Sequence, residues 1–428
     1  MKVVIMAGGM GTRIAKLISG VPKPMITIHS KPILQYQIEA FKAQGYEDII
    51  LAVGYLGGVI KEYFGDGSAF GVRIDYIVEQ SPLGTAGALY LLKDELIDDF
   101  LLINGDIVFD IDIGRFLRFH KQKGGVATLF SHPNSHPYDS GIIVADDDGR
   151  VLNWFHKEDE RTWYRNRVNA GIHILSPSIF DDALGSGLFR ELKKVDLDRD
   201  VLKPLVQTGL LFTYDSPEYA MDIGTPDRLV TAADDIRRGK VSARNLAKKQ
   251  QAIFLDRDGT INRYSGFLRC LDDFVLLPGV AQAIGKVNAS NYLAIVITNQ
   301  PVIARGEMTF EQLREMHNKM ETLLGQEGAY INAIYFCPHH PHKGFKGEVL
   351  ELKIDCACRK PKPGMLLQAA EDFNIDLGRS WMVGDSAADV FTGKAAGCKT
   401  ALIGGEGTGI GQVETYVSLL SFVHSVLN

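Results

Sequence analysis

The sequence predicts an α/β protein of two domains, each built around a doubly wound parallel sheet. The length of 428 residues corresponds to two or three domains at ~150 residues each. Two short apolar runs, Lys2–Ala7 and Ala252–Leu255, each lead directly into a polar motif. Buried parallel strands bring ligand-binding groups to the edge of an open sheet in this way. Strand-like and helix-like segments alternate after both runs, which is typical of this fold class.

Alternating segments fill the first predicted domain, residues 1–236. Apolar β-branched runs predict strands, and apolar residues at helical spacing predict helices. The predicted strands are 49–53, 72–78 and 100–103, and the predicted helices are 32–43, 84–93 and 114–123. Turns and β-branched residues become more frequent between 125 and 175, so we expect a mixed or antiparallel extension of the sheet there.

The second predicted domain, residues 252–428, shows the same alternation. Its predicted strands are 293–298, 331–336 and 381–384, and its predicted helices are 280–287, 310–324 and 364–373. Between the domains, residues 237–251 (RRGKVSARNLAKKQQ) are polar, strongly basic and poor in long apolar side chains. This composition favours a linker, and a solvated helix face within one domain is the alternative.

Composition narrows the class of function. With 46 Lys+Arg against 52 Asp+Glu the formal net charge is −6, which argues against a nucleic-acid partner and leaves small anionic ligands open. No apolar run reaches the ~18 residues of a membrane span, and the apolar N-terminal strand is too short for a secretory core. Five cysteines, an odd number, do not suggest a disulfide framework. We therefore expect a cytoplasmic protein that acts on small molecules and has no membrane partner.

A glycine-rich loop follows the first strand at residues 8–13. Glycines let backbone N–H groups approach phosphates closely, and an arginine adds a permanently charged fork. Ten residues on, a lysine lies between two prolines in an extended segment that can fold back over the same phosphates. The candidate residues for binding phosphate and for catalysis are Gly8, Gly9, Gly11, Thr12, Arg13 and Lys23.

The string GGMGTRIAKLISGVPKP resembles the signature of the sugar-1-phosphate nucleotidylyltransferases. Four further motifs agree with this family in order: PLGTAG at 82–87, NGD at 104–106, VNAG at 168–171 and MDIGTP at 221–226. The resemblance implies transfer of a nucleotidyl group from a nucleoside triphosphate to a sugar 1-phosphate, with release of pyrophosphate. It implies a base and ribose loop with Gly84 and Thr85, a sugar segment with Asn169 and Gly171, and a Mg²⁺ site at Asp106 and Asp222.

One segment departs from the family pattern. Members often carry a Glu-Lys pair near the sugar, whereas residues 155–159 here are FHKED, with the order reversed. Lys157 is the candidate for the lysine's role, and an exposed charge cluster is the alternative. Without the other motifs, Asp106 would suit a turn and Asp222 a helix N-cap.

The second apolar strand ends in Asp256-Arg257-Asp258-Gly259-Thr260, which resembles the first motif of the haloacid dehalogenase-like phosphatases. ITNQ at 297–300, RKP at 359–361 and VGDSAAD at 383–389 match later motifs of that family in order. The resemblance implies that Asp256 is a nucleophile forming a phosphoaspartyl intermediate and that Asp258 is the acid and base. The implied phosphate-binding residues are Thr298, Asn299, Arg359 and Lys360, and the implied Mg²⁺ ligands are Asp256, Asp258 and Asp385, supported by Asp389.

A cysteine and histidine cluster replaces the large cap domain that many of these phosphatases carry. The spacing C-x-H…C-x-C suits four soft ligands around a tetrahedral zinc with no open position, which would be structural. The predicted ligands are Cys337, His339, Cys356 and Cys358. His340 or His342 in place of His339, and buried free thiols, are the alternatives.

The zinc loop narrows the resemblance to the D-glycero-D-manno-heptose 1,7-bisphosphate phosphatases and the related histidinol-phosphate phosphatases. The segment NQPVIARG at 299–306 favours the heptose group and implies that Arg305 contacts the substrate's phosphate, although Pro301-Val302 replaces the usual Ser-Gly. Together the two resemblances imply that a heptose bisphosphate loses its 7-phosphate, and that the heptose 1-phosphate then reacts with GTP to give a GDP-heptose. A mannose 1-phosphate guanylyltransferase joined to another phosphatase, and a first domain that only senses a nucleotide sugar, are the alternatives.

Overall fold

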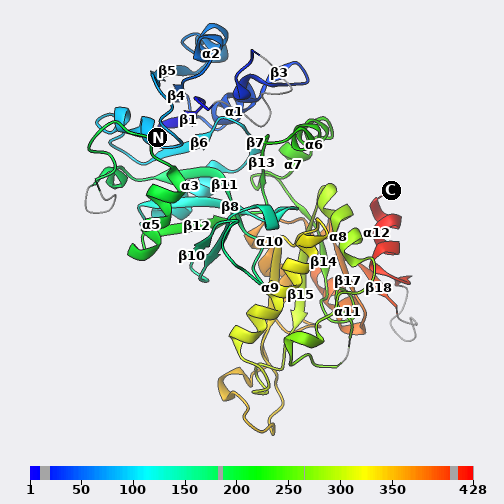
Figure 1. The fold of residues 1–428 in the computed structure, drawn as a ribbon. Coiled ribbons are helices and arrows are strands. Elements are labelled where there is room, and N and C mark those ends of the chain that lie inside the picture. The colour runs from blue at the N-terminus through cyan, green and yellow to red at the C-terminus, as the bar shows by residue number, and fades with distance from the viewer. Residues whose placement is uncertain (10–19, 182–186, 265, 405–412, 428) are drawn as a thin grey trace. The chain divides into compact units, whose positions relative to one another are not determined.

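The computed structural model describes residues 1–9, 20–181, 187–264, 266–404 and 413–427 (Figure 1). The chain separates into two compact units, and each is described here by itself. Unit 1 comprises residues 1–132, 143–154 and 169–245. Unit 2 comprises residues 133–142, 155–168 and 246–428.

A mixed sheet forms the centre of unit 1. Its parallel part is β5-β4-β1-β6, and β11 continues it antiparallel to β6. The strands of this part are β1 (Val3–Met6), β4 (Asp48–Val53), β5 (Arg73–Val78), β6 (Phe100–Asn104) and β11 (Val168–Leu175). The extension adds β8 (Ala127–His132), β9 (Ile142–Ala145), β10 (Val151–Phe155) and β12 (Leu211–Asp215). The predicted strands and the predicted mixed extension are therefore both present.

Helices in unit 1 follow the predicted spacing in two of three places. The helices are α1 (Ile33–Lys42), α2 (Gly57–Phe64), α3 (Ile113–Lys123), α5 (Lys203–Leu205), α6 (Pro226–Arg237) and α7 (Lys240–Ala243). The helix predicted over 84–93 is wrong, since only a 3₁₀ turn at Gly87–Leu92 forms there. Leu83 and Ala86 instead pair their backbones with Val195, so the start of this segment is a loop that binds its neighbour.

Residues 237–251, the predicted linker, contain both buried and exposed side chains. Lys240 on α7 is 9% exposed, and its ammonium lies 3.2 Å from the carboxylate of Asp235 on α6. Asn245 is buried and donates to Asp110 at 2.6 Å. The two units meet in sequence between residues 245 and 246. Lys240 is thus packed against an acidic partner, whereas Lys248 and Lys249 of the same segment are exposed.

Unit 2 contains a six-stranded parallel sheet in the order β16-β15-β14-β17-β18-β19. Its strands are β14 (Gln251–Leu255), β15 (Tyr292–Asn299), β16 (Ala333–Cys337), β17 (Trp381–Gly384), β18 (Lys399–Ile403) and β19 (Glu414–Tyr416). Its helices are α8 (Val280–Ala289), α9 (Phe310–Gln326), α10 (Gly364–Asp372), α11 (Ala387–Ala396) and α12 (Leu419–Leu427). Alternate residues of the central strand β14 enter two different apolar clusters, so both faces of the sheet are covered.

Two segments that precede the 245/246 boundary also belong to unit 2. Within it, Arg167 donates to Glu321 of α9 at 3.0 Å, and both side chains are at most 3% exposed. Tyr164 and Thr322 exchange hydrogen bonds close by. Among the described residues, no helix is both long enough and apolar enough to cross a bilayer.

Candidate active sites and a candidate zinc centre

A buried lysine between two carboxylates forms the centre of the site in unit 2. Asp256 follows β14, and Lys360 lies in the segment before α10. The Lys360 ammonium is 2.8 Å from Asp256 and 2.6 Å from Asp389, and it also donates to the carbonyl of Ile297 at 3.1 Å. Burial by itself would lower the pKa of Lys360, but the two carboxylates raise it above its ordinary value. The lysine is therefore charged and fixed at the carboxyl edge of the sheet.

Three carboxylates at this edge fit a divalent cation. Asp256, Asp385 and Asp389 each offer an oxygen, and these oxygens lie within 4.8 Å of one another. Burial, with the charge of Asp389 added, raises the pKa of Asp256 and raises that of Asp385 to about 6. Crowded buried carboxylates are stabilised by a cation, and their hard oxygens suit Mg²⁺. Asp389 also accepts hydrogen bonds from the backbone N–H of Ser386 at 3.1 Å and from its hydroxyl at 2.6 Å. These contacts hold Asp389 in place at the start of α11.

Asp258 does not join this group of carboxylates. Its two oxygens accept hydrogen bonds from Arg257, from Asn262 at 3.0 Å and from Gln300 at 3.0 Å. The sequence predicts an Asp258 ligand, but the third carboxylate of the cluster is Asp389. The Asp258 side chain keeps 20% exposure, as a group that meets substrate requires.

The motif at the end of β15 positions the backbone of Lys360. Asn299 is predicted to bind phosphate, but its amide accepts from the N–H of Lys360 at 3.0 Å and donates to the carbonyl of Lys360 at 3.1 Å. It therefore fixes the position of the lysine. The hydroxyl of Thr298 accepts from Gln300 at 2.9 Å, so Gln300 connects Thr298 to Asp258.

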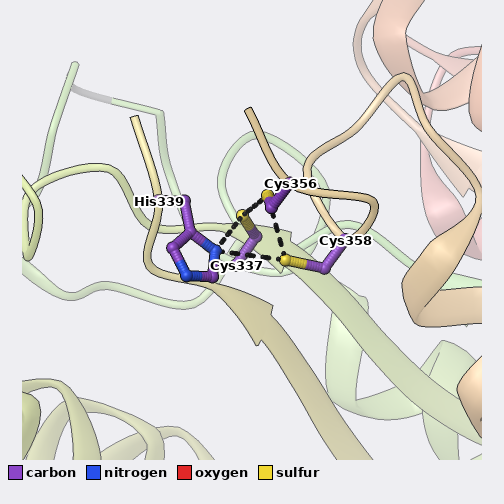
Figure 2. A group of neighbouring side chains, drawn as sticks. All are labelled: Cys337, His339, Cys356 and Cys358. Carbon is purple, nitrogen blue, oxygen red and sulfur yellow. Dashed lines mark hydrogen bonds between the residues drawn. The ribbon is translucent and has the colours of Figure 1, made fainter. Parts of the chain in front are cut away.

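Four side chains converge at the predicted zinc site, from the end of β16 and from the loops that follow it (Figure 2). The Sγ of Cys356 is 3.5 Å from that of Cys337 and 3.2 Å from that of Cys358. Nδ1 of His339 is 3.6 Å from Cys337 Sγ and 3.3 Å from Cys358 Sγ. Zn–S bonds of about 2.3 Å and Zn–N bonds of about 2.0 Å in a tetrahedron predict sulfur–sulfur distances of ~3.8 Å and sulfur–nitrogen distances of ~3.5 Å.

The chemistry of the cluster agrees with this geometry. Burial raises the pKa of the Cys337 and Cys358 thiols. At Cys356 burial acts in the same direction, but hydrogen bonds with the two neighbouring sulfurs outweigh it and lower the pKa. Three thiols so close together cannot all ionise unless a cation compensates their charge. Cys337, His339, Cys356 and Cys358 could therefore hold a zinc ion, and the geometry favours His339 over the alternative histidines. Arg359 follows directly and donates to the His339 carbonyl at 3.2 Å.

Arg305, the other predicted contact for substrate phosphate, lies between two aromatic rings. Its guanidinium carbon is 4.6 Å from the ring centre of Phe267 and 4.3 Å from that of Phe345. Its Nε is 2.8 Å from a carboxylate oxygen of Glu307. The aromatic faces restrict the guanidinium to one plane.

In unit 1, strand pairing brings the two predicted metal carboxylates together. β13 (Tyr219–Asp222) pairs antiparallel with β7 (Ile107–Asp110) so that Asp222 stands opposite Ile107, next to Asp106. Lys23 forms an ion pair with Asp106, and Arg228 donates to both oxygens of Asp222 at 2.7 Å. Two adjacent carboxylates could hold Mg²⁺ together with substrate phosphates. Of the predicted loop, Gly8 and Gly9 are described, whereas Gly11, Thr12 and Arg13 lie outside the described residues.

The predicted sugar segment is anchored by a buried polar network. Asn169 Oδ1 accepts from the N–H of Gly171 at 3.0 Å and lies 3.1 Å from Nε2 of His173. The Asn169 amide also donates to Asp198 at 3.3 Å, and burial raises the pKa of Asp198 to about 6. Lys157, in contrast, is exposed in a segment that belongs to unit 2.

The predicted nucleotide loop is also held through the backbone. Gly84 adopts a φ of +79°, where a side chain would be strained. Thr85 accepts a hydrogen bond from the N–H of Leu197 at 2.7 Å. This contact fixes the loop against the turn that carries Asp198.

Comparison with known proteins identifies both parts of the chain. Residues 2–239 match the Nucleotidyl transferase family. The chain belongs to this family. In the second half of the same chain, residues 357–424 match the HAD-hydrolase-like family. The two matches confirm the predicted pair of α/β domains.

Three similar proteins illustrate these matches. A probable mannose-1-phosphate guanylyltransferase 1 of Oryza sativa subsp. japonica is 34% identical over 54% of this nucleotidyl transferase, which spans 63% of the rice protein's length. The D-glycero-beta-D-manno-heptose-1,7-bisphosphate 7-phosphatase of Pasteurella multocida (strain Pm70) is 42% identical over 36% of this chain and 81% of its own. The structure of HddC from Yersinia pseudotuberculosis is 29% identical, with a TM-score of 0.47, over 55% of this chain and 99% of that one.

In the nucleotidyl transferase unit, the structure places beside the predicted loop a carboxylate that the sequence did not indicate, and this carboxylate accepts from the N–H of Leu83 at 3.4 Å. Glu79 follows β5, and a Cβ placed on Gly8 would come within 3.1 Å of its carboxylate. Burial raises the pKa of Glu79. A carboxylate directly beside the phosphate loop could have been suspected only from its position three residues before the PLGTAG motif.

Proposed function

We propose that the chain is a bifunctional enzyme of nucleotide-sugar synthesis. One site removes the 7-phosphate of D-glycero-D-manno-heptose 1,7-bisphosphate. The other transfers GMP from GTP to the resulting heptose 1-phosphate, which gives GDP-heptose and pyrophosphate. The observation that carries the phosphatase half is the buried Lys360 between Asp256 and Asp389, beside the four zinc-type ligands.

In the phosphatase half, each residue has a definite task. Asp256 attacks phosphorus, since its carboxylate stands at the sheet edge next to Lys360. Lys360 and Thr298 neutralise the phosphoryl oxygens, and Asp258 gives a proton to the sugar oxygen that leaves. Mg²⁺ bound by Asp256 and Asp385 would offset the negative charge of the phosphate. Arg305 and Arg359 suit the phosphate at the other end of a bisphosphate.

In the guanylyltransferase half, the protein gathers mutually repelling anions. Lys23 and Arg13 would bind the triphosphate, and Asp106 and Asp222 would hold Mg²⁺. No covalent step on the protein is needed, because the sugar 1-phosphate oxygen attacks the α-phosphorus directly.

The choice of guanine is supported by Glu79. Guanine presents two adjacent donors, its N1–H and its 2-amino group, which a single carboxylate can accept together. The Glu79 carboxylate lies against Gly8 at the start of the phosphate loop. The similarity to guanylyltransferases of the mannose type points to the same base.

The choice of heptose is supported by the order of the two reactions. The relative of the second half is named for a heptose bisphosphate, and removing its 7-phosphate yields a sugar 1-phosphate, the substrate class of the first half. The Pasteurella relative is named for the β-anomer. We nevertheless assign the α-anomer, because the nucleotidylyltransferase resemblance implies that GTP activates the α-anomer, whereas the β-anomer is activated by an adenylyltransferase of unrelated fold. Mannose 1-phosphate is the second candidate for the first half, and the rice relative favours it.

A product assay tests both halves in one tube. Purified protein receives α- or β-heptose 1,7-bisphosphate with Mg²⁺ and each nucleoside triphosphate in turn, and mannose 1-phosphate serves as the competing sugar. GDP-heptose from the α-anomer and GTP is the expected product. Phosphate release without a nucleotide sugar would overturn the guanylyltransferase half, and a clear preference for mannose 1-phosphate would replace the sugar.

A further inference from the structure

We infer that His317, acting through Arg257, is a positioning residue for Asp258; this inference rests on the proposed phosphatase function. His317 lies on α9, 59 residues after Asp258 in the sequence and outside every motif described above. A chain of hydrogen bonds runs from its ring to the guanidinium and on to the carboxylate that handles the proton.

Arg257 is the link between the two. Its side chain is fully buried, so its charge needs compensation within the protein. Its Nε and one terminal nitrogen donate to Asp258 at 3.2, 3.0 and 2.9 Å. This two-point contact fixes the plane of the Asp258 carboxylate as well as its distance.

The remaining terminal nitrogen of Arg257 is directed at His317. It lies 3.3 Å from Nε2 of the ring, and because a guanidinium only donates, the histidine accepts. The ring is therefore neutral, with its proton on Nδ1. Burial and the charge of Arg257 lower the pKa of His317 well below its ordinary value, which agrees with this assignment. Contact with the ring of Phe336, 5.8 Å between centres, keeps the imidazole in place.

The position of Asp258 matters at one bond. When an oxygen of Asp256 bonds to phosphorus, the bond from phosphorus to the sugar oxygen breaks and its electron pair stays on that oxygen. The proton of Asp258 moves to the oxygen, and Asp258 is left as a carboxylate. Water then transfers a proton to Asp258 as it attacks the phosphoaspartate, and phosphate and free Asp256 result. A carboxyl group that turns away by a fraction of an ångström slows the first step.

The geometry predicts a dependence on the leaving group. A sugar alkoxide is a poor leaving group and needs the proton, whereas p-nitrophenolate leaves without one. Loosening Asp258 should therefore slow the hydrolysis of a sugar phosphate far more than that of p-nitrophenyl phosphate. A general loss of folding or of metal would slow both alike.

The test uses the full chain with two variants of one residue. His317→Phe keeps a ring but removes the acceptor, and His317→Gln keeps an acceptor oxygen. For each variant we would measure kcat/KM on heptose 1,7-bisphosphate and on p-nitrophenyl phosphate. The value of kcat/KM reports the steps up to the departure of the leaving group, which is the step that needs the proton of Asp258. Guanylyl transfer from supplied heptose 1-phosphate and the zinc content show whether the variant chain is otherwise intact.

For His317→Phe we expect kcat/KM on the sugar phosphate to fall by about 10- to 100-fold. This is less than the full contribution of a general acid, because Asp258 itself is still present. On p-nitrophenyl phosphate the fall should be under about threefold, and His317→Gln should recover most of the lost activity. Equal losses on both substrates, or no loss, would overturn the inference. If the unmodified chain hydrolyses neither substrate, the proposed phosphatase function fails instead. Should His317→Phe not fold, His317→Ala, which also lacks the acceptor, takes its place, and Asn318→Ala, the next residue on α9, is the control. A substrate ratio for His317→Ala no different from that of the control overturns the inference.

Discussion

At the scale of single residues, charge compensation decides which carboxylates can react. Asp256 and Asp389 share one ammonium, that of Lys360, and Asp389 has additional donors from Ser386. Asp256 accepts from the N–H of Arg257 at 2.7 Å on the same oxygen that faces Lys360. Within the described part of the chain no side chain donates to its second oxygen, so Asp256 is the group with the freer electron pair. Position at the end of β14 and this asymmetry together favour Asp256 as the nucleophile.

Substituting Asp256 should separate the two activities. Asp256→Asn keeps the shape but removes the anionic oxygen that attacks phosphorus, so we expect phosphate release to fall by at least about 10³-fold. Guanylyl transfer from supplied heptose 1-phosphate should stay within about twofold. Parallel assays of phosphate and of GDP-heptose check this. Loss of both activities would contradict the assignment of independent sites.

Substituting Glu79 should change the choice of nucleotide. Glu79→Gln replaces one acceptor by a donor, and a lost base contact is typically worth about 1–3 kcal/mol. We expect kcat/KM for GTP to fall by about 10- to 100-fold while that for ATP changes little. Competition between GTP and ATP in one reaction measures the ratio directly. An unchanged ratio would show that another group selects the base.

Candidate site residues that belong to a sequence motif could be predicted. Contacts that reach these residues from distant parts of the chain could not. Asp256, Lys360 and the four zinc-type ligands are tied to short strings with fixed spacing. Gln300 lies in a predicted motif, but its contact with Asp258 spans 42 residues. His317 contacts Arg257 across 60 residues. The first contact depends on the segment after β15 and the second on how α9 packs against the sheet, and no local sequence pattern records either.

At the scale of elements, the loop between β16 and α10 depends on its four soft ligands. Residues 338–349 and 353–363 contain no helix or strand, so few backbone hydrogen bonds hold the loop together. A structural zinc contributes binding energy of about 10–16 kcal/mol in small folded units. The segment Arg359-Lys360 directly follows Cys358, so ordering of the loop and placement of the Lys360 ammonium are linked.

Removing one zinc ligand should therefore disable the phosphatase selectively. For Cys356→Ser we expect less than one zinc per chain and a phosphatase rate lower by at least about tenfold, because Lys360 loses its fixed position. The matched control is Cys270→Ser, an exposed cysteine outside the cluster, which should keep both zinc and rate. Metal analysis alongside the phosphate assay checks both. Full zinc content in Cys356→Ser would contradict the ligand set.

Helices and strands were predicted correctly where burial determines the pattern of apolar residues. The prediction failed where hydrogen bonds to a distant backbone segment determine the conformation. The continuous apolar runs of β4, β6 and β15 are buried on both faces, and their positions follow from sequence. The segment 84–93 has helical spacing too, but Leu83 and Ala86 bond to the backbone of Val195, more than a hundred residues later. Spacing of side chains carries no information about that pairing.

At the scale of the whole molecule, unit 2 is discontinuous in sequence. A division at a linker was expected from composition, yet residues 133–142 and 155–168 belong to this unit and 240–245 to the other. The buried pair of Arg167 and Glu321 explains the first part: each charge is costly to bury alone, so the two segments are held where the pair is complete. Neither residue stands out in the sequence, because an isolated Arg or Glu normally lies on the surface.

Breaking this pair should destabilise unit 2 without touching either site. Arg167→Met leaves Glu321 buried without its guanidinium, which typically costs about 3–5 kcal/mol. For a unit of this size that corresponds to a fall in Tm of about 6–20 °C, to be followed as the temperature at which phosphatase activity is lost. The double variant Arg167→Met/Glu321→Met should recover much of the loss, since two apolar side chains need no partner. A fragment beginning at residue 246 lacks Arg167 altogether and should show the same loss as Arg167→Met or a larger one. If that fragment were as stable as the full chain, the two early segments would have no part in unit 2, and the boundary expected from composition would be the correct one.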